Sequence, residues 1–378
     1  MHIQPFRLER LFAQYEFKAR YLLSPSDCEG LAQTELLKMA NPDYLDLWND
    51  LKLGYTESAG HPLLRLQVSR LYETVPPDQV MVAVPEEAIF IVMHTLLSAG
   101  DHVIAVSPAY QSLHEIALSI GCQLTPWKLH PGNGKWMLDM EVLEKSIHPR
   151  TRIIILNFPH NPTGYMLSHS QLGMVIDLAR KHNLYVFSDE MYSLLEYDPA
   201  MRLPAVCDLY EKGISLSGLS KAFALPGLRI GWLASQDREL VDRWLIYKDY
   251  TTICSSAPSE ILGIIALDAK DKILRRNLDI IQKNLSLVRS FMDEFGKQIE
   301  WLPPEAGSVA FPRWKGKMSL EAFCQDMIDQ RGVMIVPASI FDYPGNHFRI
   351  GLGRNNLGEA LQQVREFLVE KKSWIFPS

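Results

Sequence analysis

The stretch from 217 to 232, SGLSKAFALPGLRIGW, holds one lysine and one arginine among small and apolar residues. Lys221 has Ala, Leu, Phe and Gly around it, and an amine that is partly desolvated is a nucleophile suited to Schiff-base chemistry. Arg229, eight residues on, presents a planar fork of donors that fits a phosphate or a carboxylate, and we expect it to be buried. The pair predicts a covalent amine attachment beside an anion anchor. A strand end with a solvated lysine and a structural arginine is the simpler alternative.

The order Ser, Lys, seven residues, Arg, any residue, Gly resembles the lysine motif of the pyridoxal-phosphate enzymes called class I and II aminotransferases, which have fold type I. The resemblance implies an α/β large domain on a mostly parallel, seven-stranded sheet, with a small α+β domain beside it. It assigns Lys221 to the Schiff base with pyridoxal 5'-phosphate, and Arg229, Ser220 and Ser217 to the phosphate. Gly218 stands where many relatives have Ser or Thr, which leaves the two serines to share the phosphate.

Further residues of that family pattern follow strand-like runs, in the family's order. Asn161, in Asn-Pro-Thr-Gly, resembles the asparagine that binds the phenolic oxygen of the cofactor, and Tyr192 resembles the tyrosine that shares this oxygen. Asp189 resembles the aspartate that pairs with the pyridinium nitrogen and makes the ring an electron sink. Tyr110 resembles the aromatic residue that stacks on the ring, with an ordinary core tyrosine as the alternative.

Two further segments of the sequence are candidates for contacting the cofactor's phosphate. The helix start at Pro85 stands where the family holds the phosphate with backbone amides, usually through glycine and small residues. Since proline has no N–H, the amides of Glu86 and Glu87 are the remaining donors. Tyr55 resembles the tyrosine that reaches across a two-fold interface to the neighbouring cofactor phosphate, which implies a homodimer. Without the resemblance, the Tyr55 segment reads as a capped helix start.

Three charged residues are candidates for binding the substrate, which the resemblance implies is a small molecule, an amino acid. Arg349 resembles the arginine that clamps the α-carboxylate, near Asn161. A substrate held there projects its side chain toward the mouth of the site, where the family's N-terminal segment lies. Glu9, on an amphipathic helix expected over 5–23, and Asp27, in the following loop, are the candidates for binding a cationic side chain. A solvated surface charge is the alternative for each acid.

Strand and helix patterns alternate through the middle of the chain, which favours a parallel sheet with its ligands at the carboxyl ends of the strands. A long helical stretch over 258–295 is expected to bridge to the second domain, and an amphipathic helix over 357–372 is expected at the end of the sequence. We divide the chain into an N-terminal helix and loop covering the site (1–45), a large cofactor-binding domain (46–260), a bridging helix (261–295) and a small domain (296–378).

The composition of the chain limits the class of protein to which it can belong. The chain has 378 residues, 47% hydrophobic and 22% charged, which is ordinary for a globular protein. A net charge of -6 gives no reason to expect a nucleic-acid partner. The sequence predicts no membrane span and no signal peptide, so we expect a cytoplasmic protein. Its five cysteines are scattered without a CxxC pair, which favours reduced thiols and no metal site.

The prediction of the reaction depends on a resemblance to a smaller group of enzymes within this family. The segments 157–162, 225–232, 306–313 and 331–337 look most like capreomycidine synthase and related cyclases, which close the guanidino group of a hydroxylated arginine onto its own side chain. The resemblance implies elimination of hydroxide and intramolecular addition of the guanidine, giving a capreomycidine- or enduracididine-type product. Transamination between an amino acid and an α-keto acid uses the same residues and is the alternative. A non-catalytic, cofactor-binding regulatory domain is a third; Lys221, Asp189 and Arg349 together argue against it.

Overall fold

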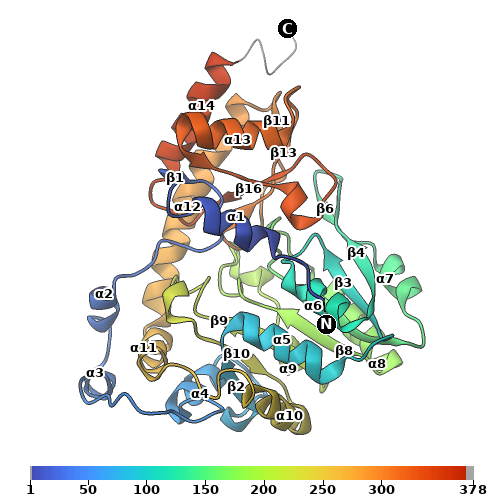
Figure 1. The fold of residues 1–378 in the computed structure, drawn as a ribbon, viewed down its shortest axis with the longest axis vertical. Helices are drawn as coiled ribbons and strands as arrows, with labels where there is room; N and C mark the ends of the chain where they lie inside the picture. Colours follow the sequence, from blue (N-terminus) through green and yellow to red (C-terminus); the bar gives the residue numbers. More distant parts are fainter. Residues whose placement is uncertain (1, 372–378) are drawn as a thin grey trace.

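The computed structural model describes residues 2–371, and its centre is a seven-stranded sheet (Figure 1). Five neighbouring strands are parallel: β4, β3, β7, β8 and β9. The sixth strand, β10, is antiparallel both to β9 and to the edge strand β2. The expected mostly parallel α/β sheet is therefore confirmed. In sheet order the strands are β2 (Val80–Ala83), β10 (Gly231–Ala234), β9 (Gly213–Gly218), β8 (Tyr185–Asp189), β7 (Thr151–Asn157), β3 (His102–Ser107) and β4 (Gln123–Lys128).

The central strand β7 shows why this sheet is covered on both faces. Its run of apolar residues buries Ile153 and Ile155 in one cluster and Ile154 and Leu156 in another, because successive side chains of a strand point to opposite faces. The first cluster includes helices α5 (Pro85–Leu96), α6 (Ser112–Ile120) and α10 (Arg238–Lys248). The second includes α7 (Met140–Ser146) and α8 (His169–His182), which Ser168 caps at its N-terminus.

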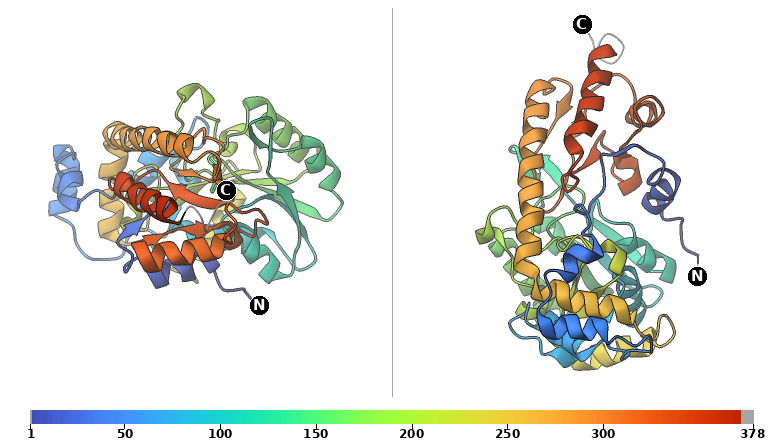
Figure 2. Two further views of the ribbon diagram at one scale, coloured as in Figure 1. Left: turned by 90° about the horizontal axis from the view of Figure 1, so that it is seen from above. Right: turned by 90° about the vertical axis from the view of Figure 1, so that its left-hand side faces the viewer.

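The helical stretch expected over 258–295 is two helices, α11 (Ala257–Asp268) and α12 (Lys270–Glu294), with a break at Ala269. The break lets α11 pack against α3 (Pro42–Asn49) and α4 (Pro62–Ser69) while α12 continues away from the sheet to α14 (Leu357–Glu370). Figure 2 shows α12 as a column that joins the two parts of the molecule. The last residue of the helix expected over 357–372 lies outside the described residues.

The part beyond α12 is built on short strands. A three-stranded sheet has the order β12 (Val309–Ala310), β16 (Phe348–Gly351), β15 (Val336–Pro337), and a two-stranded pair joins β11 (Ile299–Glu300) to β13 (Arg313–Trp314). Helices α13 (Leu320–Arg331) and α14 pack beside them. The remaining short elements are α2 (Gln33–Leu37), α9 (Val206–Leu209), β5 (His130–Gly132), β6 (Lys135–Met137), η1 (Pro77–Gln79), η2 (Pro199–Met201), η3 (Pro226–Leu228) and η4 (Ala338–Phe341).

The N-terminal segment differs from the helix expected over 5–23. Helix α1 covers only Arg7–Tyr15, and strand β1 (Tyr21–Leu22) pairs in parallel with β14 (Val333–Met334). The apolar residues after position 20 therefore form a strand that makes a two-stranded sheet with β14, while the amphipathic pattern up to Tyr15 is helical. The sequence shows the pattern of each segment but not the distant strand that pairs with the second.

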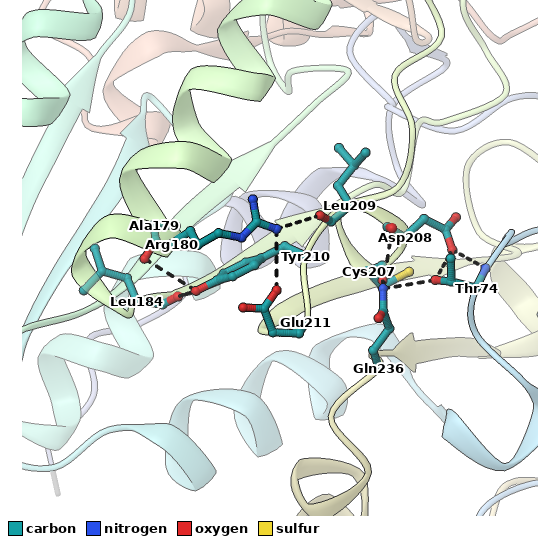
Figure 3. A network of polar contacts seen from close by, with 10 residues as sticks. All are labelled: Thr74, Ala179, Arg180, Leu184, Cys207, Asp208, Leu209, Tyr210, Glu211 and Gln236. Carbon is teal, nitrogen blue, oxygen red and sulfur yellow. Dashed lines mark hydrogen bonds and ion pairs between the residues drawn. The ribbon is translucent and has the colours of Figure 1, made fainter.

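Polar contacts fasten α9 between the sheet and its neighbours (Figure 3). The carboxylate of Asp208 accepts hydrogen bonds from the backbone and the hydroxyl of Thr74, and Gln236 donates to the Cys207 carbonyl. The Tyr210 hydroxyl donates to the carbonyl of Leu184, while Arg180 donates to that of Leu209. Such contacts satisfy the backbone groups that a four-residue helix leaves open. In the described part of the sequence, no helix is long and apolar enough to cross a membrane, and all five cysteines are free thiols.

Candidate active site

A cavity of about 480 Å³ opens at the carboxyl ends of the strands, with residues of α1 along one side. The topology places it there because Asp189 ends β8, while Asn161 and Lys221 follow β7 and β9 by a few residues. Eleven residues singled out from the sequence line it: Glu9, Asp27, Glu86, Tyr110, Asn161, Asp189, Tyr192, Ser220, Lys221, Arg229 and Arg349.

Lys221 lies in the loop after β9, where its Nζ donates a hydrogen bond to Ser26 Oγ at 2.9 Å. The preceding Gly218 packs directly against Gly231 of β10, and a Cβ at position 218 would lie 2.9 Å from the Gly231 Cα. The glycine that departs from the family pattern is therefore required by the contact between β9 and β10. Ser220, which is buried, remains beside the lysine.

Asp189 is almost fully buried, and its Oδ1 accepts a hydrogen bond from the Met191 amide at 3.1 Å. Burial, with the nearby Glu86 carboxylate adding to it, raises the pKa of its carboxyl to about 7, although the Met191 hydrogen bond and Lys221 oppose the shift. A bound cation, such as a protonated ring nitrogen, would restore the ionised form.

Arg349, on β16, is buried between the rings of Phe12 and Phe341, with its Cζ 6.0 and 5.2 Å from their centroids. Its Nη1 donates to Asn161 Oδ1 at 3.1 Å, and its Nε donates to the Ser24 carbonyl at 3.0 Å. The guanidinium is thus held in one orientation at the cavity wall, as a carboxylate clamp requires.

Two cavity hydroxyls fit a cofactor. Among the described residues, Tyr192 Oη and Ser220 Oγ are buried side-chain atoms with no hydrogen-bond partner, although a buried polar group without one costs about 1–3 kcal/mol. A ligand with an acceptor at each position would satisfy both atoms. The phenolic oxygen and the phosphate of pyridoxal phosphate are such acceptors, and the buried carboxyl of Asp189 would be a suitable partner for its ring nitrogen.

Three predicted residues do not line the cavity. Ser217 lies on β9 next to Leu216, which does, and alternate residues of a strand face opposite sides. The Glu87 carboxylate accepts hydrogen bonds from the hydroxyls of Thr251 and Thr252. Tyr55 is 93% exposed and lies away from the cavity of its own subunit.

We expected Arg229 to be buried, and for the single chain this expectation is wrong. Its residue is exposed at the edge of the cavity, with φ 55° and one guanidinium nitrogen donating to the Pro226 carbonyl at 3.1 Å. The turn of η3 holds the arginine at this edge, because the left-handed backbone at Arg229 directs the chain from the turn into β10.

The two N-terminal acids line the cavity but already have partners. Glu9 Oε1 accepts a hydrogen bond from the Tyr110 hydroxyl at 2.8 Å. Asp27 Oδ2 accepts one from Arg354 Nη2 at 2.9 Å, in an ion pair whose side chains are 15% and 19% exposed. Asp27 therefore faces a guanidinium of its own subunit, a pairing between residues that are far apart in the sequence.

Two acidic side chains reach the cavity without being predicted to do so from the sequence. Glu16, at the end of α1, has no side-chain hydrogen bond or ion pair among the described residues, and burial, with Asp27 adding to it, raises its pKa. Its spacing of seven residues from Glu9, two helical turns, is the signal that could have found it. Glu86 is expected from the sequence to contribute its amide, whereas its carboxyl group lines the cavity.

Comparison with known proteins agrees with this geometry. The model of the family "Aminotransferase class I and II" matches residues 23–364. Capreomycidine synthase of Streptomyces vinaceus is 30% identical over 315 residues, which is 82% of this chain and 80% of that protein.

Solved structures give the same result. A pyridoxal-phosphate-dependent aminotransferase from Streptococcus suis has a TM-score of 0.91 at 30% identity, covering 98% of this chain and 99% of the other. The pyridoxal-phosphate-dependent cyclase OrfR has a TM-score of 0.89 at 24% identity, covers 98% of each chain and shows the likeness of fold. The cofactor of this protein is pyridoxal 5'-phosphate, and the chain belongs to the class I and II aminotransferase family.

Proposed function

We propose that this enzyme eliminates water from a hydroxylated arginine and closes the guanidino group onto the side chain, giving a cyclic guanidine amino acid. The observation that carries the proposal is the set of carboxylates that α1 and the following loop bring to the cavity that Arg349 also lines. Glu9 and Asp27 have partners, and Glu16 is the acid left to meet a cationic side chain. The likeness to capreomycidine synthase supports the same substrate class.

The proposed reaction assigns a different role to each residue of the site. Arg349 and Asn161 bind the α-carboxylate of the substrate. The bound cofactor supplies an electron sink for the charge that develops at Cα. Lys221, oriented by Ser26, removes the Cα proton and returns it. The bond from the substrate's side-chain carbon to its hydroxyl oxygen breaks, hydroxide leaves with a proton as water, and a guanidine nitrogen forms the new bond to carbon.

Transamination is the second candidate, and the likeness to the Streptococcus suis aminotransferase favours it. The two reactions give different products from one mixture of holoenzyme, hydroxylated arginine and an α-keto acid. Cyclisation yields an amino acid lighter than the substrate by one water, and the keto acid stays unchanged. Transamination yields a new keto acid and a new amino acid. Mass spectrometry of the mixture separates these outcomes, and a keto-acid product alone would reject the cyclase.

The substrate class is tested at Glu16. A partly desolvated carboxylate–guanidinium pair is worth about 2–4 kcal/mol when one partner is removed, so Glu16→Gln should lower kcat/KM on hydroxylated arginine roughly thirty- to thousand-fold. Glu29→Gln is the control, because Glu29 lies on the same segment outside the cavity lining and should change kcat/KM by about twofold at most. On a hydroxylated citrulline, whose side chain is neutral, both variants should equal the parent. An unchanged kcat/KM for Glu16→Gln on the arginine substrate would contradict the proposal that the substrate has a cationic side chain.

We also propose that the active unit is a homodimer in the cytoplasm, with Tyr55 serving the phosphate of the neighbouring subunit. In support, the loop before α4 is anchored while Tyr55 points outward: Glu260 accepts from Thr56 Oγ1 at 2.8 Å and from the His61 amide at 2.9 Å. Lys248, fully buried, donates to the Ser58 carbonyl. Mixing inactive Lys221→Ala chains with Tyr55→Ala chains should restore activity through mixed dimers, whereas full activity of a monomer would exclude the role.

A further inference from the structure

Glu86 puts a carboxyl group at the start of α5, inside the cavity. It is the second residue of the helix and lines the cavity together with Pro85. Helix N-termini bind anions through free backbone N–H groups, and Pro85 has none to offer. The helix therefore presents a side-chain carboxyl where its first amide donor is lacking.

The surroundings of Glu86 come from several elements. The hydroxyls of Tyr110 and Ser112, at the start of α6, lower its pKa, but burial outweighs them and raises it. Of the charged groups, Glu9 on α1 raises this pKa and Arg229 lowers it.

Two further groups lie on neighbouring strands and helices. Asp189, at the end of β8, interacts with the Glu86 charge. On α10, the buried Lys248 interacts with Glu87, whose carboxylate lies outside the cavity. The Glu86 carboxyl is thus enclosed by two other acids, while Arg229 is the cation that acts on it directly.

The same end of the cavity is suited to the cofactor's phosphate. Ser220 Oγ is buried without a partner, and Arg229 stands at the cavity edge. A phosphate dianion next to an ionised carboxylate is strongly unfavourable where water is excluded. A protonated carboxyl, by contrast, donates one hydrogen bond and carries no charge.

We propose that Glu86 is a cofactor-binding residue whose carboxyl group takes up one proton from solvent when pyridoxal phosphate binds and donates it in a hydrogen bond to the phosphate. The O–H donor replaces the backbone donor that Pro85 lacks. This role does not depend on which reaction the enzyme catalyses, because it concerns only the phosphate.

The test is the dissociation constant of pyridoxal phosphate for the cofactor-free protein, followed by absorbance from about pH 6 to pH 9. In the parent, binding should weaken about tenfold per pH unit above the pKa of Glu86, since each bound cofactor then requires a proton. Glu86→Gln, a neutral isostere with an N–H donor, lacks this requirement. The ratio of the two dissociation constants, parent over variant, should rise at least tenfold across this pH range. Glu87→Gln, one residue on and outside the cavity, should follow the parent.

Pyridoxal, which lacks the phosphate, separates this role from an effect on Asp189 and the ring nitrogen. With pyridoxal the ratio of parent to Glu86→Gln should stay within about twofold at every pH. A ratio for pyridoxal phosphate that does not change with pH, or an equal change for pyridoxal, would overturn the proposal.

A measurement on the parent alone covers the case in which Glu86→Gln does not fold. Calorimetry at about pH 8, in buffers of different ionisation enthalpy, counts the protons bound with each ligand. Pyridoxal phosphate should take up close to one proton more than pyridoxal, because its free phosphate is already a dianion at this pH. Equal proton counts for the two ligands would contradict the proposal.

Discussion

The floor of the cavity and its cover are built in different ways. We define the floor as Asn161, Asp189, Tyr192 and Ser220, which are buried and follow the ends of parallel strands. We define the cover as residues 7–30. Its helix α1 buries only Leu8 fully, and the segment joins the rest of the protein through a two-residue strand, polar contacts and partly buried apolar side chains. On the floor, two hydroxyls lack partners, whereas in the cover two of the three cavity acids have them. A rigid floor can hold one cofactor while changes in the cover alter the substrate.

Lys221→Ala should have the largest effect, because it removes the amine to which we expect pyridoxal phosphate to be attached. We expect turnover to fall by roughly a thousandfold or more, and the absorbance of the cofactor imine to disappear from the purified protein. The Ser26→Ala variant changes only the hydrogen bond that the cover makes to this amine and should keep the imine. An imine band that survives in Lys221→Ala would show that the cofactor is attached to another lysine.

Asp189→Asn should act in opposite directions on activity and stability. Turnover should fall roughly hundredfold or more if, as we expect, Asp189 is the charged partner of the ring nitrogen. The pKa of Asp189 is about 7 in the folded, cofactor-free protein, against its ordinary value of 3.8, so the aspartate destabilises the fold increasingly as pH rises between these values. The cofactor-free variant should therefore be more stable than the parent by on the order of 3–4 kcal/mol at about pH 8 and equal to it at about pH 4. Denaturant unfolding at both pH values measures this, and a difference independent of pH would contradict the cause.

Asp27→Asn tests the cover, where we expect a smaller effect. Its partly buried ion pair with Arg354 should contribute about 1–3 kcal/mol to the free energy of unfolding, between the values for exposed and buried pairs. Glu141→Gln is the control, because it breaks an exposed pair with Lys145 whose side chains are 78% and 75% exposed. That change should stay within about 0.5 kcal/mol. Equal losses in the two variants would mean that Asp27 does not help to hold the cover.

The floor was more predictable from the sequence than the cover. Asp189 and Asn161 follow apolar runs that are recognisable as buried strands, and parallel strands bring such residues to one edge of a sheet. The pairing of Asp27 with Arg354 joins distant parts of the sequence, so no local pattern indicates it. The exposure of Arg229 depends on the turn before it, and the carboxyl of Glu86 enters the cavity because of how α5 packs.

The pairing of β1 with β14 also bears on protein synthesis. Tyr21 and Leu22 pair with Val333 and Met334. This strand partner of the N-terminal segment is translated after every residue that lines the cavity except Arg349. Domains generally fold from the N-terminus as the polypeptide emerges, but this segment must wait until β14 has been translated. A truncated product that ends before β14 would carry the lysine and the floor without the strand that seats the cover. Quality control of the nascent polypeptide therefore meets a chain whose N-terminal segment stays without its strand partner until β14 has been made.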